Sequence, residues 1–201
     1  MSSEGLEPRK ILLVEDEAIV ALSEKHTIEQ HGFTVETVHS GEVAVHATQE
    51  DQSISLVLMD IDLGSGIDGT EAARQILQMR QLPIVFLTGH AEREYVERVK
   101  RITSYGYVLK DAGEFVLIES IEMAFNLFDA HREVAVKEQS LSHIVEEAPV
   151  GIFQTARGRT FRRMNQEMAH ILGFADPEDA REHYTDIASE LFVDPNRYRT
   201  F

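Results

Sequence analysis

The chain of 201 residues contains no cysteine, and its 19 lysine and arginine side chains are outnumbered by 35 aspartate and glutamate side chains. The lack of cysteine excludes disulfides, thiolate metal sites and cysteine-based catalysis within these residues, and it fits a reducing compartment. The formal net charge of −16 argues against nucleic acid and anionic membranes as partners. A protein that holds phosphate groups along a backbone needs a basic face.

Long hydrophobic runs are also missing. No stretch approaches the ~18 consecutive apolar residues of a membrane span, and the first ten residues lack the apolar centre of a signal peptide. The composition, 43% hydrophobic and 27% charged, is that of a globular protein with a hydrophobic core. We therefore expect a cytoplasmic protein with no nucleic acid and no membrane among its partners.

The negative charge is concentrated in the first two thirds of the sequence. Residues 1–131 hold 23 acidic and 10 basic side chains, a net charge of −13, whereas residues 132–201 hold 12 and 9, a net charge of −3. This change in composition predicts a boundary near residue 131.

Short apolar runs alternate with helical patterns in the first part. Continuous runs of this kind are typical of strands covered on both faces, and a weaker run at 34–38 predicts an edge strand. Strands that alternate with helices predict a doubly wound α/β domain with a five-stranded parallel sheet. The runs are Ile11–Val14, Leu56–Met59, Ile84–Leu87 and Tyr107–Leu109; the helices are expected at 18–30, 41–49, 70–79 and, mostly charged, 92–102.

Polar residues follow the apolar runs where each strand is expected to end. They are Glu15 and Asp16, Asp60, Thr88, and Lys110. Ligands of open parallel sheets bind beyond the carboxyl ends of the strands. Two carboxylates ~4 Å apart repel each other by ~4 kcal/mol at an effective dielectric constant near 20, so three in one cleft require a cation. Oxygen ligands without His or Cys favour Mg²⁺.

Residues 8–131 resemble a receiver domain of bacterial two-component response regulators. The resemblance implies a flavodoxin-like fold with strand order 2-1-3-4-5. It also implies a phosphorelay regulator that is not an enzyme beyond its own phosphorylation and dephosphorylation. The matching motifs, in order, are Ile11–Glu17, Leu58–Leu63, Asp68–Gly69, Phe86–Gly89 and Gly106–Lys110.

The resemblance implies that Asp60 accepts a phosphoryl group from the phosphohistidine of a histidine kinase or a phosphotransfer protein. Asp16 and Asp60 would bind Mg²⁺ directly, Glu15 would act through water, and Asp62 would offer its backbone carbonyl. Lys110 would pair with the phosphoryl oxygens.

The resemblance also implies a switch. Thr88 would move toward the phosphoryl group and Tyr107 would turn inward with it, although a half-buried residue at a strand edge is an equally good interpretation of Tyr107. Asp62 and His90 lie two residues after Asp60 and Thr88, where side chains could reach the attacking water. His90 fits a plain surface histidine equally well.

The sequence departs from the family pattern in two places. Asp111 follows Lys110 where the family often has proline, and the loop over 63–69 is one residue longer than usual and lacks its proline. The alternative function is a degenerate receiver that serves as a phosphorylation-independent binding scaffold. The presence of Asp16, Asp60, Thr88 and Lys110 argues against it.

A helical pattern begins at Glu114 and continues into the 140s. Leu127, Val134 and Leu141 repeat every seven residues, which favours a helical connector over 132–143 that pairs with a second copy as a short coiled coil. His131 and Glu138 occupy the alternate core positions and weaken this interpretation, so a final helix followed by a polar linker stays open.

Residues 144–201 resemble the first half of a PAS sensor domain, an α+β module. The sequence predicts two short strands, a helix opened by Asn165 and ended by Gly173, and short helices from Pro177. The three closing strands of such a fold are missing from the sequence. We therefore expect a truncated module that is loosely ordered or completed by a second copy, and hence a homodimer through the connector or this module. The matching motifs are Glu146–Phe153, Met164–Ala169, Ile171–Phe174, Thr185–Ile187 and Asp194–Pro195.

Overall fold

The computed structural model describes residues 8–89, 102, 105–156, 160–185 and 187–190. Apart from Ile102, the helix expected over 92–102 lies outside these residues, and so does His90. Contacts divide the chain into two units, Met1–His131 and Arg132–Phe201.

The first unit is built on a five-stranded sheet. The strands lie in the order β2-β1-β3-β4-β5, and every neighbouring pair is parallel. This confirms the predicted doubly wound α/β fold and its strand order. The strands are β1 (Lys10–Val14), β2 (Thr34–Val38), β3 (Ile54–Asp60), β4 (Ile84–Thr88) and β5 (Tyr107–Leu109).

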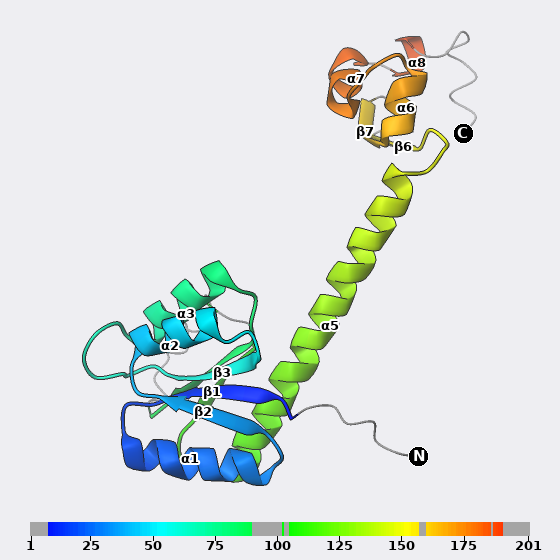
Figure 1. The fold of residues 1–201 in the computed structure, drawn as a ribbon. Coiled ribbons are helices and arrows are strands. Elements are labelled where there is room, and N and C mark those ends of the chain that lie inside the picture. The colour runs from blue at the N-terminus through cyan, green and yellow to red at the C-terminus, as the bar shows by residue number, and fades with distance from the viewer. Residues whose placement is uncertain (1–7, 90–101, 103–104, 157–159, 186, 191–201) are drawn as a thin grey trace, which may run out of the picture. The chain divides into compact units, whose positions relative to one another are not determined.

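Helices cover both faces of this sheet. In Figure 1, α2 (Gly41–Glu50) and α3 (Gly69–Met79) lie on one face, and α1 (Ala18–Gln30) lies on the other with the start of α5 (Glu114–Glu146). Local signals set the helix ends. The side chain of Ser40 accepts a hydrogen bond from Val43 N at the start of α2, and Asp68 accepts one from Glu71 N at the start of α3.

Two hydrophobic cores explain why the apolar runs are continuous. Along β1, Leu12 and Val14 pack toward α2 and α3, whereas Ile11 and Leu13 pack toward α1 and α5. All four side chains are fully buried. A strand covered on both faces has no solvent side, so its sequence does not alternate with polar residues.

Gly69 brings α3 against the end of β3. Its amide donates a hydrogen bond to the carbonyl oxygen of Ile61, and a Cβ at this position would lie 1.8 Å from the carbonyl oxygen of Asp60. Only glycine fits this approach. The contact fixes the backbone of Asp60 from the α3 side.

The second unit contains the end of α5, a hairpin and three short helices. The hairpin strands β6 (Phe153–Ala156) and β7 (Thr160–Met164) are antiparallel, followed by α6 (Gln166–Ile171), α7 (Pro177–His183) and α8 (Ile187–Glu190). Asn165 is fully buried, accepts hydrogen bonds from Ile152 N and Met168 N, and donates to two carbonyl oxygens. A small core of six buried residues packs beside it: Phe161, Met164, Met168, Ala169, Ala180 and Ile187.

Helix α5 is 33 residues long and includes the connector expected over 132–143. All residues from 129 to 147 are exposed in the single chain; they form the later part of α5 and the first residue after it. Among the described residues, no helix combines the length and the hydrophobicity that crossing a membrane requires.

Candidate functional site

Three carboxylates gather at the carboxyl edge of the sheet. Glu15 and Asp16 follow β1, and Asp60 is the last residue of β3. Each offers an oxygen that lies within 4.8 Å of the others. Glu15 is fully buried and Asp60 is 3% exposed, whereas Asp16 is exposed. Two buried carboxylates beside a solvent-facing one form a set of oxygen ligands that a divalent cation can reach from outside.

Lys110 joins the two buried carboxylates. Its Nζ lies 2.5 Å from Oε2 of Glu15 and 2.8 Å from Oδ2 of Asp60. The lysine follows β5, and its own amide donates to the carbonyl oxygen of Thr88. The parallel sheet therefore brings together three residues that are far apart in the sequence, as the positions of the strand ends predicted.

Burial decides the protonation tendencies in this cluster. Desolvation raises the pKa of both Glu15 and Asp60 above the usual range and outweighs the hydrogen bonds from Lys110 that lower it. Burial also lowers the pKa of Lys110, but its hydrogen bonds to Asp60 and Glu15 outweigh that effect and leave it above the usual range. The lysine is therefore charged at neutral pH and partly neutralises the two acids.

The remaining expected site residues surround this cluster. Thr88 ends β4, is 1% exposed, and lies on the strand between β3 and β5. The side chain of Asp62 is exposed, and its amide donates to Oδ1 of Asp60 over 3.3 Å. Tyr107 opens β5 and is 40% exposed, so its side chain is not turned into the core. Asp16, Asp60, Thr88 and Lys110 thus meet at one edge, and Tyr107 stands apart.

Sequence reasoning missed one acidic side chain close to this cluster. Glu24 lies on α1, and its Oε2 is buried without a hydrogen-bond partner in the described part of the chain. Desolvation, then the charges of Glu15 and Asp60, raise its pKa to about 7, against a smaller opposing effect of Lys110. A signal was present, because Glu24 lies three residues after the buried Ala21 and four before the buried Ile28.

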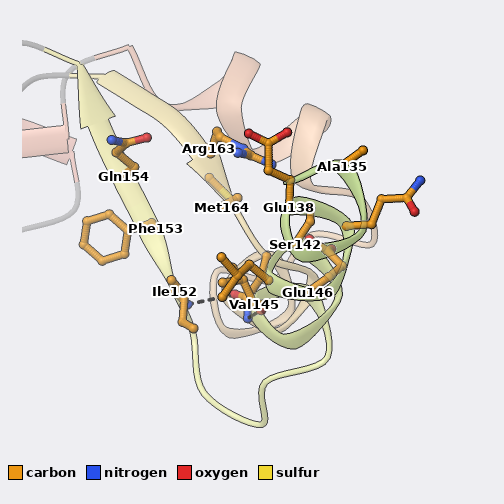
Figure 2. Close-up of a pocket in the computed structure, with 13 residues that line it drawn as sticks. Ala135, Glu138, Ser142, Val145, Glu146, Ile152, Phe153, Gln154, Arg163 and Met164 are labelled. Atoms are coloured by element: carbon orange, nitrogen blue, oxygen red, sulfur yellow. Dashed lines mark hydrogen bonds between the residues drawn. The ribbon is translucent and has the colours of Figure 1, made fainter. Parts of the chain in front are cut away.

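A separate groove lies within the second unit. It has a volume of about 850 Å³ and runs between the end of α5 and the hairpin. Figure 2 shows Glu138, Ser142 and Val145 along the helix, across from the hairpin strand that carries Phe153 and follows Ile152. Its walls mix apolar and charged side chains and contain no cluster of metal-ligating groups among the described residues.

Comparisons with known proteins agree on the first unit. Residues 11–122 match the response regulator receiver domain family. The chain is similar to the transcriptional regulatory protein PdtaR of Mycobacterium tuberculosis, with 30% identity over 76% of this chain and 77% of that protein.

Two solved structures are also similar. One is the N-terminal domain of a response regulator/sensory box/GGDEF three-domain protein from Carboxydothermus hydrogenoformans, with 44% identity, a TM-score of 0.57, and 61% and 98% of the two chains covered. The other is the signal receiver domain of a modulated diguanylate cyclase from Desulfovibrio desulfuricans G20, with 30% identity, a TM-score of 0.57, and 62% and 99% covered.

Proposed function

The chain belongs to the response regulator receiver family, which places it in two-component phosphorelay signalling, and on that premise we propose that Asp60 is its phosphoacceptor. The observation that carries the proposal is the pair of contacts from Lys110 to Glu15 and Asp60. An ammonium between two buried acids, with Asp16 beside them, forms a site that is prepared for a phosphoryl group.

The transfer itself needs one nucleophile and a place for negative charge. An oxygen of Asp60 attacks the phosphorus of a phosphohistidine on a histidine kinase or phosphotransfer protein, the new P–O bond forms, and the P–N bond breaks. The leaving imidazole keeps the electron pair of that bond. Lys110, 2.8 Å from Asp60, would turn toward the phosphoryl oxygens as they arrive.

Mg²⁺ is the cation that fits the oxygen-only cluster. The ligand oxygens of Glu15, Asp16 and Asp60 lie within 4.8 Å of one another, and none of these residues is a soft ligand. When bound, Mg²⁺ would neutralise charge on the transferring phosphoryl group. Asp16 and Asp60 would bind it directly, Glu15 through water, and Asp62 by its carbonyl oxygen.

The switch would start from Thr88 and Tyr107. A phosphoryl group on Asp60 adds charge and acceptor oxygens next to the end of β4, where Thr88 can donate its hydroxyl. The exposed position of Tyr107 on the neighbouring β5 then corresponds to the state before phosphorylation. The inward turn of Tyr107 is proposed from the family resemblance, as is the movement of Thr88.

The simplest test is incubation with a small acyl phosphate and Mg²⁺, followed by intact mass measurement. We expect one phosphoryl adduct, which Asp60→Asn abolishes and Asp129→Asn, a surface carboxylate paired with Arg9, leaves unchanged. No adduct in the unmutated protein would defeat the proposal and favour the alternative, a receiver used only as a binding scaffold.

The second unit is proposed to be a PAS-like sensory module that the receiver controls. Its strands, the helix capped by Asn165 and the helix from Pro177 follow the expected order. A receiver followed by a sensory box also describes the similar protein from Carboxydothermus hydrogenoformans. For the whole protein, we propose that neither nucleic acid nor a membrane is among the partners.

A homodimer through α5 is proposed from the exposed residues of its second half. Val134 is 56% exposed and Leu141 is 63% exposed, seven residues apart on a helix whose sides are open to solvent. Because the chain has no cysteine, a single Leu141→Cys variant reports pairing without background. Mild oxidation should link this variant to itself faster than Val136→Cys. Equal rates at both positions would contradict the pairing.

A further inference from the structure

The loop between β3 and α3 contacts the acidic cluster on one side. It starts directly after Asp60 and ends at Asp68, the residue that caps α3. Gly64 lies near the middle with a φ of 59°, and a Cβ there would be 2.8 Å from Oδ2 of Asp16. The backbone of this loop therefore stands directly against the exposed carboxylate of the cluster.

The other side of the same loop is held by α2. The amide of Ile67 donates a hydrogen bond of 2.9 Å to Oε1 of Glu42. Gly66, with a φ of 101°, presses against the same carboxylate, since a Cβ there would lie 2.4 Å from that oxygen. The hydrogen bond from Ile67 lowers the pKa of Glu42 below its usual range, because the bond favours the charged carboxylate.

The start of α2 fits this loop closely. A Cβ on Gly41 would lie 2.7 Å from Cγ1 and 2.8 Å from the carbonyl oxygen of Ile67. Ser40 fixes the start of the helix by accepting a hydrogen bond from Val43 N. Glu42 therefore projects from a defined helix end, and its carboxylate accepts a hydrogen bond from Ile67 while lying close to Gly66.

We infer that Glu42 is a positioning residue for the phosphorylation site, an inference that rests on the proposed function. Its carboxylate holds the loop at Ile67 and lies close to Gly66, and the loop in turn keeps Gly64 beside Asp16 and the amide of Asp62 beside Asp60. Without Glu42 the loop withdraws from the cluster, and the cation loses its fixed set of oxygen ligands. Glu42 touches neither the phosphoryl group nor the cation.

The experiment measures Mg²⁺ binding to the unphosphorylated protein by isothermal titration calorimetry, and beside it the Mg²⁺ dependence of the rate of adduct formation with a small acyl phosphate. We compare the unmutated protein with Glu42→Ala, Glu42→Gln and Glu50→Ala, the last an exposed acid on the same helix that pairs with His46. Glu42→Ala should raise the Mg²⁺ concentration for half-maximal rate by roughly threefold or more, while the rate at saturating Mg²⁺ changes little. Glu42→Gln keeps an oxygen for Ile67 N and should stay close to the unmutated protein.

An unchanged Mg²⁺ dependence in Glu42→Ala overturns the positioning role, and so does a defect in Glu42→Gln as large as that in Glu42→Ala. A defect of the same size in Glu50→Ala also overturns it, because the effect would then follow from lost surface charge. If the unmutated protein forms no adduct at any Mg²⁺ concentration, the proposed function itself fails, which is distinct from failure at Glu42 alone.

Discussion

Glu24 should make the protein less stable as the pH rises. Its Oε2 is buried and lacks a partner among the described residues, and its pKa is raised from 4.5 to about 7, first by desolvation and then by the charge of Glu15. Below pH 4.5 the carboxyl is protonated in both the folded and the unfolded chain. Between pH 4.5 and about 7 only the unfolded chain loses the proton, so the free energy of unfolding falls.

The size of this effect follows from the same pKa. A change from 4.5 to about 7 corresponds to roughly 3.5 kcal/mol at ~1.4 kcal/mol per pKa unit. The remainder of the side chain is only partly buried, and solvent screening reduces the expected effect to about 1–2 kcal/mol. Glu24→Gln removes the charge and nearly preserves the shape. The variant should be more stable than the unmutated protein by that amount at pH 8 and about equal to it at pH 4.

Denaturant unfolding without Mg²⁺ at pH 4, 6 and 8 measures this difference. Burial also raises the pKa values of Glu15 and Asp60, so the test compares the free energy of unfolding of the variant with that of the unmutated protein at each pH. Glu29→Gln is the matched control, since Glu29 lies on the same helix, is exposed, and faces Lys25 at 3.7 Å. A stability gain in Glu24→Gln that does not depend on pH would refute the reasoning, and so would a loss at pH 8.

Three further changes test other parts of the structure. Gly69→Ala places a Cβ 1.8 Å from the carbonyl oxygen of Asp60 and should destabilise the first unit by ~3 kcal/mol or more, measured by denaturant unfolding. Lys110→Met leaves Glu15 and Asp60 without their shared cation and should cost about 3 kcal/mol at pH 8; an unchanged unfolding midpoint would contradict this. Asn165→Ala removes four hydrogen bonds and should lower the free energy of unfolding by about 2–4 kcal/mol. Hydrogen exchange should become faster at the backbone amides of Ile152 and Met168, which donate to Asn165.

The fold of the first unit could be predicted from the sequence because burial on both faces leaves a pattern of its own. Ile11–Val14 is apolar throughout, and the structure buries all four side chains. Helix limits were equally readable where a local signal exists, as with Ser40 before α2 and Gly32, at a φ of 86°, after α1. These signals act between residues close in the sequence, so no knowledge of distant contacts is needed.

The membership of the site could be predicted for a similar reason. Parallel strands end at one edge of a sheet, so the residues at the carboxyl ends of β1, β3, β4 and β5 had to lie near one another. The strand pattern could not predict which side chains of the site contact one another. That Lys110 contacts both Glu15 and Asp60, and that Tyr107 is exposed, depends on the side-chain conformations and on packing from several elements.

The sequence by itself determined the alternation of strands and helices and the set of acids, threonine and lysine at the sheet edge, because these follow from burial and from chain direction. Only the tertiary structure decided that Glu24 has a buried carboxylate oxygen and that Glu42 holds the loop beside Asp16. Charged residues on helices usually face solvent, so the helical spacing of Glu24 from Ala21 and Ile28 does not by itself predict a buried carboxylate oxygen. The contact between Glu42 and Ile67 joins residues 25 positions apart, and it exists only once α2 and the loop have packed together.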